Sequence, residues 1–243
     1  MELTLYKLLE RINFRLPFPE GVKEDDICKK FVEEVRARVR DSNLKIDSKV
    51  NAQKLGIVKG RGEEAWVRAV AEIGHPLQPD IDMLYAIKRG EGYELVGVEV
   101  KVLELSRGRE VPYIPRSRDK RGFYAGLDEA LALLTWGVDY AYLWHIVWDP
   151  EKLMRKALEK ERPAAQRFMY YGIYEGIVSC LVEECKLPLG YLFTVASKEG
   201  DKLKFFKEDE FVLHEEPKSI CNPFLEKEPV KKLRKHLIQY VKR

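Results

Sequence analysis

Hydrophobic residues form two short runs along the chain, and a charged turn separates them. The runs lie in residues 79–87 and 93–102, and residues 88–92 between them carry charges and two glycines. Runs of this length that flank a glycine-containing turn predict a β-hairpin. Because apolar residues occupy both faces of each run, we expect both strands to lie inside a sheet rather than at its edge.

Charged residues interrupt these apolar strands at regular places. Glu99 and Lys101 are two residues apart, so their side chains share one face of the second strand. If the turn is centred between Gly90 and Glu91, Asp82 lies opposite Glu99, and Asp80 lies opposite Lys101. This register predicts two carboxylates and an ammonium group on one face of the sheet.

Helical periodicity dominates much of the remaining chain. Apolar residues three or four positions apart predict helices over residues 25–40, 62–73, 123–136, 149–160, 164–185 and 230–242. In the second of these helices, the predicted buried face consists of Trp66, Val67, Val70 and Ile73. In the helix over 123–136, Asp128 and Glu129 are expected on the solvated face. Residues 41–56 show no clear pattern.

Further apolar runs predict strands at residues 140–148, 189–196 and 203–206. A helix between two strands permits parallel pairing, so the strand at 140–148 is expected beside the hairpin in a mixed sheet. The fold class is therefore α/β. We divide the chain into an N-terminal helical extension (1–56), a core (57–148) and a C-terminal part (149–243) that completes or flanks the same domain.

Composition narrows the functional classes. The chain has 243 residues, 45% of them hydrophobic and 34% charged, which is typical of a globular protein and excludes a disordered one. We find no apolar leader and no membrane-spanning run, and so expect a cytoplasmic protein without membrane association. The four cysteines are expected to be buried free thiols.

The net charge of +3 is too small to attract nucleic acid by itself, so such binding requires a local basic patch. One candidate is the loop over 106–121, in which basic side chains could hold phosphates. Tyr124 follows and could stack on a base. The basic candidates are Arg107, Arg109, Arg116, Arg118, Lys120 and Arg121.

The motifs PDIDMLYAI and GVEVKV, followed by a helix and a strand, resemble the PD-(D/E)XK nuclease superfamily. The stretch KGRGEEAWV is similar to the opening of archaeal Holliday-junction resolvases, in which a glutamate contributes to the metal site. The resemblance implies a restriction-endonuclease-like αβα sandwich with a central mixed β-sheet. It also implies a metal-dependent nuclease that hydrolyses DNA with Mg²⁺ or Mn²⁺. The protein could act as a homodimer.

By this resemblance Asp82, Glu99 and the backbone carbonyl of Val100 bind the metal, together with Glu64. Lys101 then orients the attacking water, helps to deprotonate it, or stabilises the developing charge. Two assignments stay open. Asp80 competes with Asp82 as the principal ligand, and otherwise supports it; Glu63 competes with Glu64.

Two other interpretations stay open. The hairpin charges could form cross-strand ion pairs on an exposed sheet face, in a protein without this activity. Alternatively, the chain could be a non-catalytic nucleic-acid-binding or scaffold protein with a nuclease-like fold.

Overall fold

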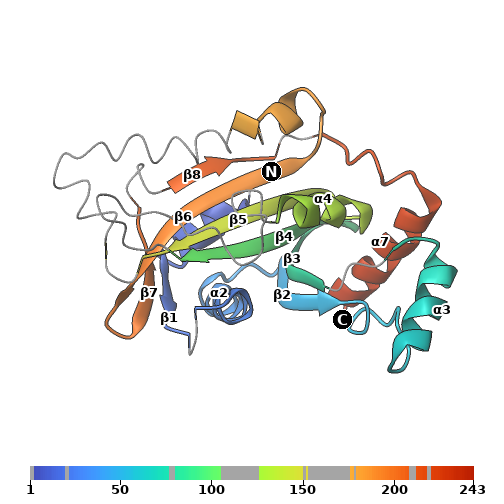
Figure 1. Cartoon of the computed structure of the whole chain (residues 1–243), viewed down its shortest axis with the longest axis horizontal. Coiled ribbons are helices and arrows are strands. Elements are labelled where there is room, and N and C mark those ends of the chain that lie inside the picture. Colours follow the sequence, from blue (N-terminus) through green and yellow to red (C-terminus); the bar gives the residue numbers. More distant parts are fainter. Residues whose placement is uncertain are drawn as a thin grey trace.

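The computed structural model describes most of the chain and places its elements around one sheet (Figure 1). The described residues are 3–19, 22–76, 80–104, 126–149, 152, 176–177, 179–207, 212–217 and 220–243. The basic loop and Tyr124 fall outside these ranges. So does most of the predicted helix over 164–185. Of the predicted helix over 149–160, only residues 149 and 152 are described.

The fold is α/β, and the described residues form a mixed, curled central sheet of eight strands. Their order is β1-β7-β6-β5-β4-β3-β2, and β8 pairs with β6 beside this path. β4, β5 and β6 are parallel neighbours, whereas the other pairs are antiparallel. The strands are β1 (Arg15–Pro17), β2 (Leu44–Asn51), β3 (Asp80–Arg89), β4 (Gly92–Glu104), β5 (Tyr140–Trp148), β6 (Leu189–Glu199), β7 (Lys202–Phe205) and β8 (Val212–Glu215).

The predicted hairpin is confirmed in both position and register. β3 and β4 are joined at Gly90, which has the positive φ of 58° that a tight turn requires. Met83 pairs with Val98 and Arg89 with Gly92, which is the register expected from the sequence. Both strands lie inside the sheet, and β5 pairs in parallel with β4 as predicted.

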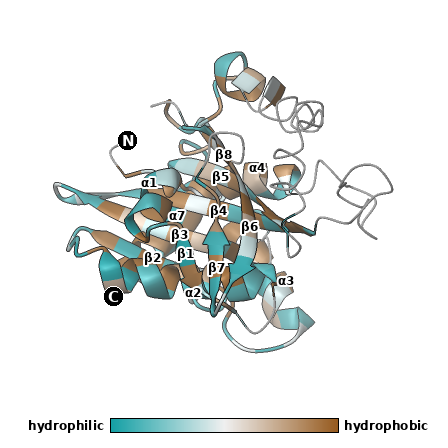
Figure 2. Cartoon of the chain, turned by 90° about the vertical axis from the view of Figure 1, so that its left-hand side faces the viewer, coloured by the Kyte–Doolittle hydropathy of each residue, from teal (hydrophilic) through white to brown (hydrophobic). Residues whose placement is uncertain are grey.

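Helices cover both faces of the sheet, because alternate strand residues supply two separate cores. Leu84, Leu95 and Leu143 face α3, α4 and α7, whereas Met83 and Val98 face α1 and α2. The helices are α1 (Leu5–Arg11), α2 (Glu24–Arg38), α3 (Glu63–Ile73), α4 (Leu127–Thr135) and α7 (Glu228–Val241). Figure 2 shows hydrophobic colour concentrated on the strands in the middle of the molecule.

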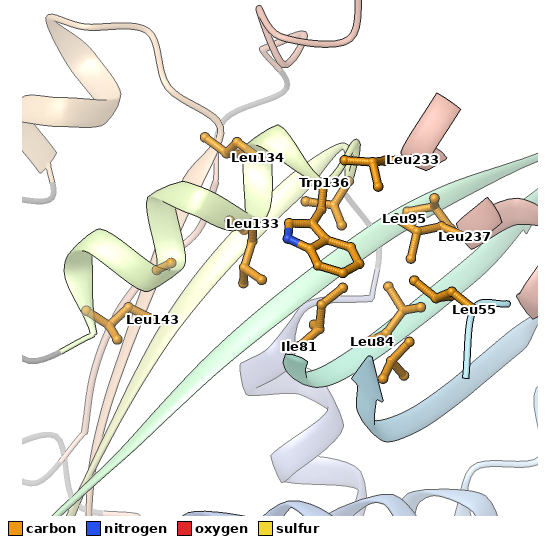
Figure 3. Close-up of a cluster of buried hydrophobic side chains, with 14 of the residues drawn as sticks. Leu55, Ile81, Leu84, Leu95, Leu133, Leu134, Trp136, Leu143, Leu233 and Leu237 are labelled. Atoms are coloured by element: carbon orange, nitrogen blue, oxygen red, sulfur yellow. The ribbon is translucent and has the colours of Figure 1, made fainter. Parts of the chain in front are cut away.

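The first core is centred on Trp136, at the end of α4 (Figure 3). Its indole lies among Leu133 of α4, Leu95 of β4, and Leu233 and Leu237 of α7 (Figure 3). All of these side chains are buried. This packing ties α4 to the sheet, and α4 carries part of the candidate site described below.

Residues 1–56 supply the strands β1 and β2 to the sheet beside the helices α1 and α2. Two predictions about the fold are wrong. Val67 is 61% exposed and is not on the buried face of α3, which consists of Ala65, Ala69 and the predicted Ile73 at spacings of four. Of the four free thiols, only Cys28 is buried; the others, Cys180, Cys185 and Cys221, are exposed.

Candidate active site

A cleft of about 350 Å³ lies where α2 and α4 meet β2, β3 and β4. Four of the five predicted catalytic residues, Asp80, Asp82, Glu99 and Lys101, line it. The lining contains six acidic residues and only two lysines, so it carries an excess of negative charge when all are ionised. The lining residues are Glu24, Lys49, Asp80, Asp82, Glu99, Lys101, Asp128, Glu129 and Ala132.

Asp82 and Glu99 are the two most deeply buried carboxylates of this cleft, at 4% and 5% exposure. Continuing the register beyond Met83 and Val98 places them opposite each other. The Asp82 carboxylate substitutes for a backbone acceptor, because its Oδ2 accepts the Val100 N–H at 2.7 Å. At Asp82 and Glu99 the sheet face is therefore buried, not exposed as the alternative interpretation expected.

Lys101 joins the two sides of the cleft. Its Nζ lies 2.8 Å from Oε1 of Glu99 and 2.6 Å from Oε2 of Glu129 on α4. Oε2 of Glu24 on α2 lies 4.0 Å away. Burial alone would lower the pKa of Lys101, but the hydrogen bonds that it donates to Glu129 and Glu99 raise it above its usual value. The group therefore stays an ammonium ion.

A second lysine, Lys49 of β2, lies on the opposite side of Asp82. Its Nζ is 2.6 Å from Oδ1 of Asp82, 2.6 Å from Oδ1 of Asp25 and 3.3 Å from Oδ2 of Asp80. Burial alone would lower the pKa of Lys49, but hydrogen bonds to Asp25 and Asp82 raise it. Lys49 therefore stays protonated and provides a positive charge among three carboxylates.

Among the carboxylates of the cleft, Glu99 has a strongly raised pKa. Burial, reinforced by the negative charge of Asp82, raises the pKa of Glu99 to about 9, and Lys101 only partly offsets this. Burial likewise raises the pKa of Glu24, with Lys101 opposing it. Without a further cation, these carboxylates share too little positive charge to ionise together.

The structure brings Asp80, Asp82, Glu99 and Lys101 together, as the sequence predicts. It does not bring Glu64 or Glu63 to this cleft: both are exposed in the first turn of α3 and neither lines it. The helical stripe of Ala65, Ala69 and Ile73 packs inward, and Glu64 lies outside that stripe.

One further prediction about the site is wrong. Glu129, assigned to a solvated helix face, lines the cleft and pairs with Lys101. The reason is that α4 packs along β4 and β5, which turns its first turn toward the strand that carries Lys101.

Sequence reasoning missed Glu24, Asp25 and Lys49. Glu24 and Asp25 begin α2, where acidic residues are common because they stabilise a helix N-terminus. Their pattern therefore carried no functional signal. Lys49 lies in β2, a strand that was not predicted.

Comparison with known proteins adds no relative: no family model, no curated protein and no solved structure matched the chain. Among the helices in the described ranges, none is long and apolar enough to cross a membrane. Within the same ranges, no three His, Cys, Asp or Glu side chains converge closely enough to hold a metal ion by themselves.

Proposed function

We propose that the protein is a metal-dependent deoxyribonuclease of the PD-(D/E)XK type, built on a restriction-endonuclease-like sandwich. The observation that carries this proposal is the pair of buried carboxylates, Asp82 and Glu99, with Lys101 beside them in one cleft. The order of elements supports it as well. A helix that begins with Glu24 precedes the Asp strand and the Glu-x-Lys strand, and α4 and the parallel strand β5 follow.

The donor set fits Mg²⁺ or Mn²⁺. These are hard cations, and Mg²⁺ in proteins typically uses one or two carboxylates, with waters and substrate phosphate as the other ligands. Asp82 and Glu99 would provide the carboxylates, and the carbonyl of Val100 is a third candidate. The excess of acidic groups and the raised pKa of Glu99 indicate that the cleft lacks positive charge. A bound divalent ion supplies this charge and makes a bound water more acidic.

The protein's own groups then have separate tasks. Asp82 is held in place by the Val100 N–H, so its carboxylate presents a fixed geometry. Lys101 remains protonated, which favours water orientation and stabilisation of negative charge on the phosphate over proton abstraction. Glu129 and Glu24 flank the Lys101 ammonium group and limit its movement. Glu24 lines the cleft, so we assign to it the role that the resemblance implied for Glu64.

The test is cleavage of single-stranded, duplex and branched DNA with Mg²⁺ or Mn²⁺. Lys101→Ala and Asp82→Asn are each expected to reduce cleavage by about 100-fold or more, the loss typical when a group that stabilises transition-state charge is removed. Lys101→Ala should still bind DNA. The matched control is Glu64→Gln, which removes an exposed carboxylate outside the cleft and should leave cleavage unchanged.

The alternative is a non-catalytic nucleic-acid-binding protein. It predicts a DNA mobility shift without cleavage for the wild-type protein on all three substrates and with both metals. Cleavage that persists in both cleft variants would assign the activity to another site or to a contaminant.

A further inference from the structure

Lys49 places its ammonium group among three aspartates. Its Nζ contacts one oxygen from each of Asp25, Asp82 and Asp80, at 2.6, 2.6 and 3.3 Å. Asp82 is almost fully buried, and both of its oxygens are engaged: Oδ1 by Lys49 and Oδ2 by the Val100 N–H. A metal ion that binds Asp82 must therefore compete with one of these two partners.

The two partners are not equally easy to displace. The Val100 N–H belongs to the backbone of β4, a central strand that is paired on both sides. Lys49 instead offers a flexible side chain that has two other carboxylates within 3.3 Å. When the Lys49 ammonium group moves away from Asp82, it can still form ion pairs with Asp25 and Asp80. The exchange then needs only side-chain movement.

The backbone at Lys49 supports a specific role for this side chain. Lys49 has a φ of 52°, a left-handed conformation that is uncommon for residues other than glycine. The ladder with β3 continues on both sides of it, through Ser48 with Met83 and Val50 with Ile81. The conformation is therefore held by the surrounding strand, and strained residues of this kind concentrate at functional sites.

We propose that Lys49 is the resident counter-ion of Asp82, which it stabilises in the metal-free protein, and that the divalent ion must displace it in order to bind. This inference rests on the proposed metal-dependent function and adds a control on how tightly the metal binds. Lys49 acts here through Asp82, as a positioning residue and a competitor. By linkage, the binding free energy that the metal spends on displacing Lys49 is recovered in a variant that lacks this lysine.

The experiment measures binding of Mg²⁺ and Mn²⁺ alone by titration calorimetry, with thermal unfolding in EDTA and in Mg²⁺. Lys49→Met should bind the metal about tenfold more tightly than the wild-type protein, a typical size for coupling between two sites. It should also unfold at a lower temperature in EDTA, because three carboxylates lose their partner. Mg²⁺ should then raise its unfolding temperature more than that of the wild-type protein.

Three further variants separate the proposal from a purely structural role. Lys49→Arg keeps the charge and should restore wild-type metal affinity. Lys49→Gln keeps a polar side chain and should reproduce the tighter binding even if Lys49→Met does not fold. Lys54→Met is the matched control, since Lys54 also pairs with an aspartate, Asp47, at 3.5 Å but lies outside the cleft. Its metal affinity should be unchanged.

Equal or weaker metal binding by the neutral Lys49 variants, beside clear binding by the wild-type protein, would overturn this inference alone. The proposed function would then stand with Lys49 as a purely structural residue. Folded wild-type and Lys49→Gln proteins that both fail to bind either metal would remove the metal site itself, and this inference with it.

Discussion

At the scale of single residues, the site is defined by how few positive charges its buried carboxylates share. Asp82 has Lys49 and the Val100 N–H as partners. Among the described residues, Glu99 has Lys101 as its one cationic partner, and Lys101 also pairs with Glu129 at 2.6 Å. Burial, reinforced by the negative charge of Asp82, raises the pKa of Glu99 to about 9, and Lys101 offsets this only in part.

The pKa of Glu99 makes stability depend on pH. Since it is about 4.5 in an ordinary glutamate and about 9 in the fold, the folded protein binds a proton between these values that the unfolded chain has released. Metal-free stability should therefore fall as the pH rises from 5 to 8. In Glu99→Gln, which mimics the protonated form, this loss should shrink by about 2 kcal/mol, because one pKa unit corresponds to about 1.4 kcal/mol and coupling to Asp82 reduces the full effect.

Urea unfolding in EDTA at several pH values between 5 and 8 measures this difference. Glu64→Gln, on the exposed face of α3, controls for the substitution itself and should follow the wild-type curve. Curves for Glu99→Gln and the wild-type protein that run parallel across this range would show that Glu99 titrates normally in the fold.

At the scale of elements, the sequence predicts the helices and strands whose hydrophobic pattern is strong. The β3–β4 hairpin, its register, α4, β5 and α7 all follow from it. β2 did not, because the sequence LKIDSKVN has little apolar content and is interrupted at Lys49, whose conformation no local pattern indicates. Without β2, Asp25 and Lys49 could not be placed beside Asp82. The sequence therefore predicts the site residues on the hairpin. The residues on α2 and β2 reach the cleft only through tertiary packing, which no local pattern indicates.

The start of α4 determines where Lys101 lies. Gly126, the N-cap of α4, has a φ of 84°, and a Cβ at this position would lie 2.8 Å from Cγ of Lys101 and 2.9 Å from Cδ1 of Leu143. Gly126→Ala should therefore move the Lys101 side chain. Cleavage should fall by roughly tenfold to a hundredfold, as expected for a displacement of about 1 Å at a reacting centre.

Gly62→Ala is the matched control for this element. Gly62 is the N-cap of α3 and has a φ of 89°, but a Cβ added there would meet no atom within 4 Å. Both variants should lose about 1 kcal/mol of stability from the positive φ, measured by thermal unfolding. A similar loss of cleavage in both variants would attribute the effect to stability rather than to the position of Lys101.

At the scale of the whole molecule, charge is distributed unevenly. The net charge is only +3, yet the cleft is lined by six acidic residues against two lysines. A DNA phosphate that approaches Asp82 and Glu99 therefore meets repulsion unless a cation is present. The basic residues that could offset it lie in the segment 106–121, and their contribution remains a prediction from the sequence alone.

This charge distribution predicts that DNA binding itself requires a divalent cation. With the inactive Lys101→Ala variant and a fluorescent duplex, anisotropy should show affinity about tenfold higher in Ca²⁺ than in EDTA, because Ca²⁺ also prefers carboxylate oxygens and neutralises the cleft. Adding Asp82→Asn should abolish most of this dependence. Replacing the six basic residues of the loop with Gln should instead weaken binding equally with and without Ca²⁺, and flatten the salt dependence. Equal affinity in Ca²⁺ and EDTA would place the bound DNA away from the cleft, which would leave Asp82 and Glu99 without contact to a scissile phosphate.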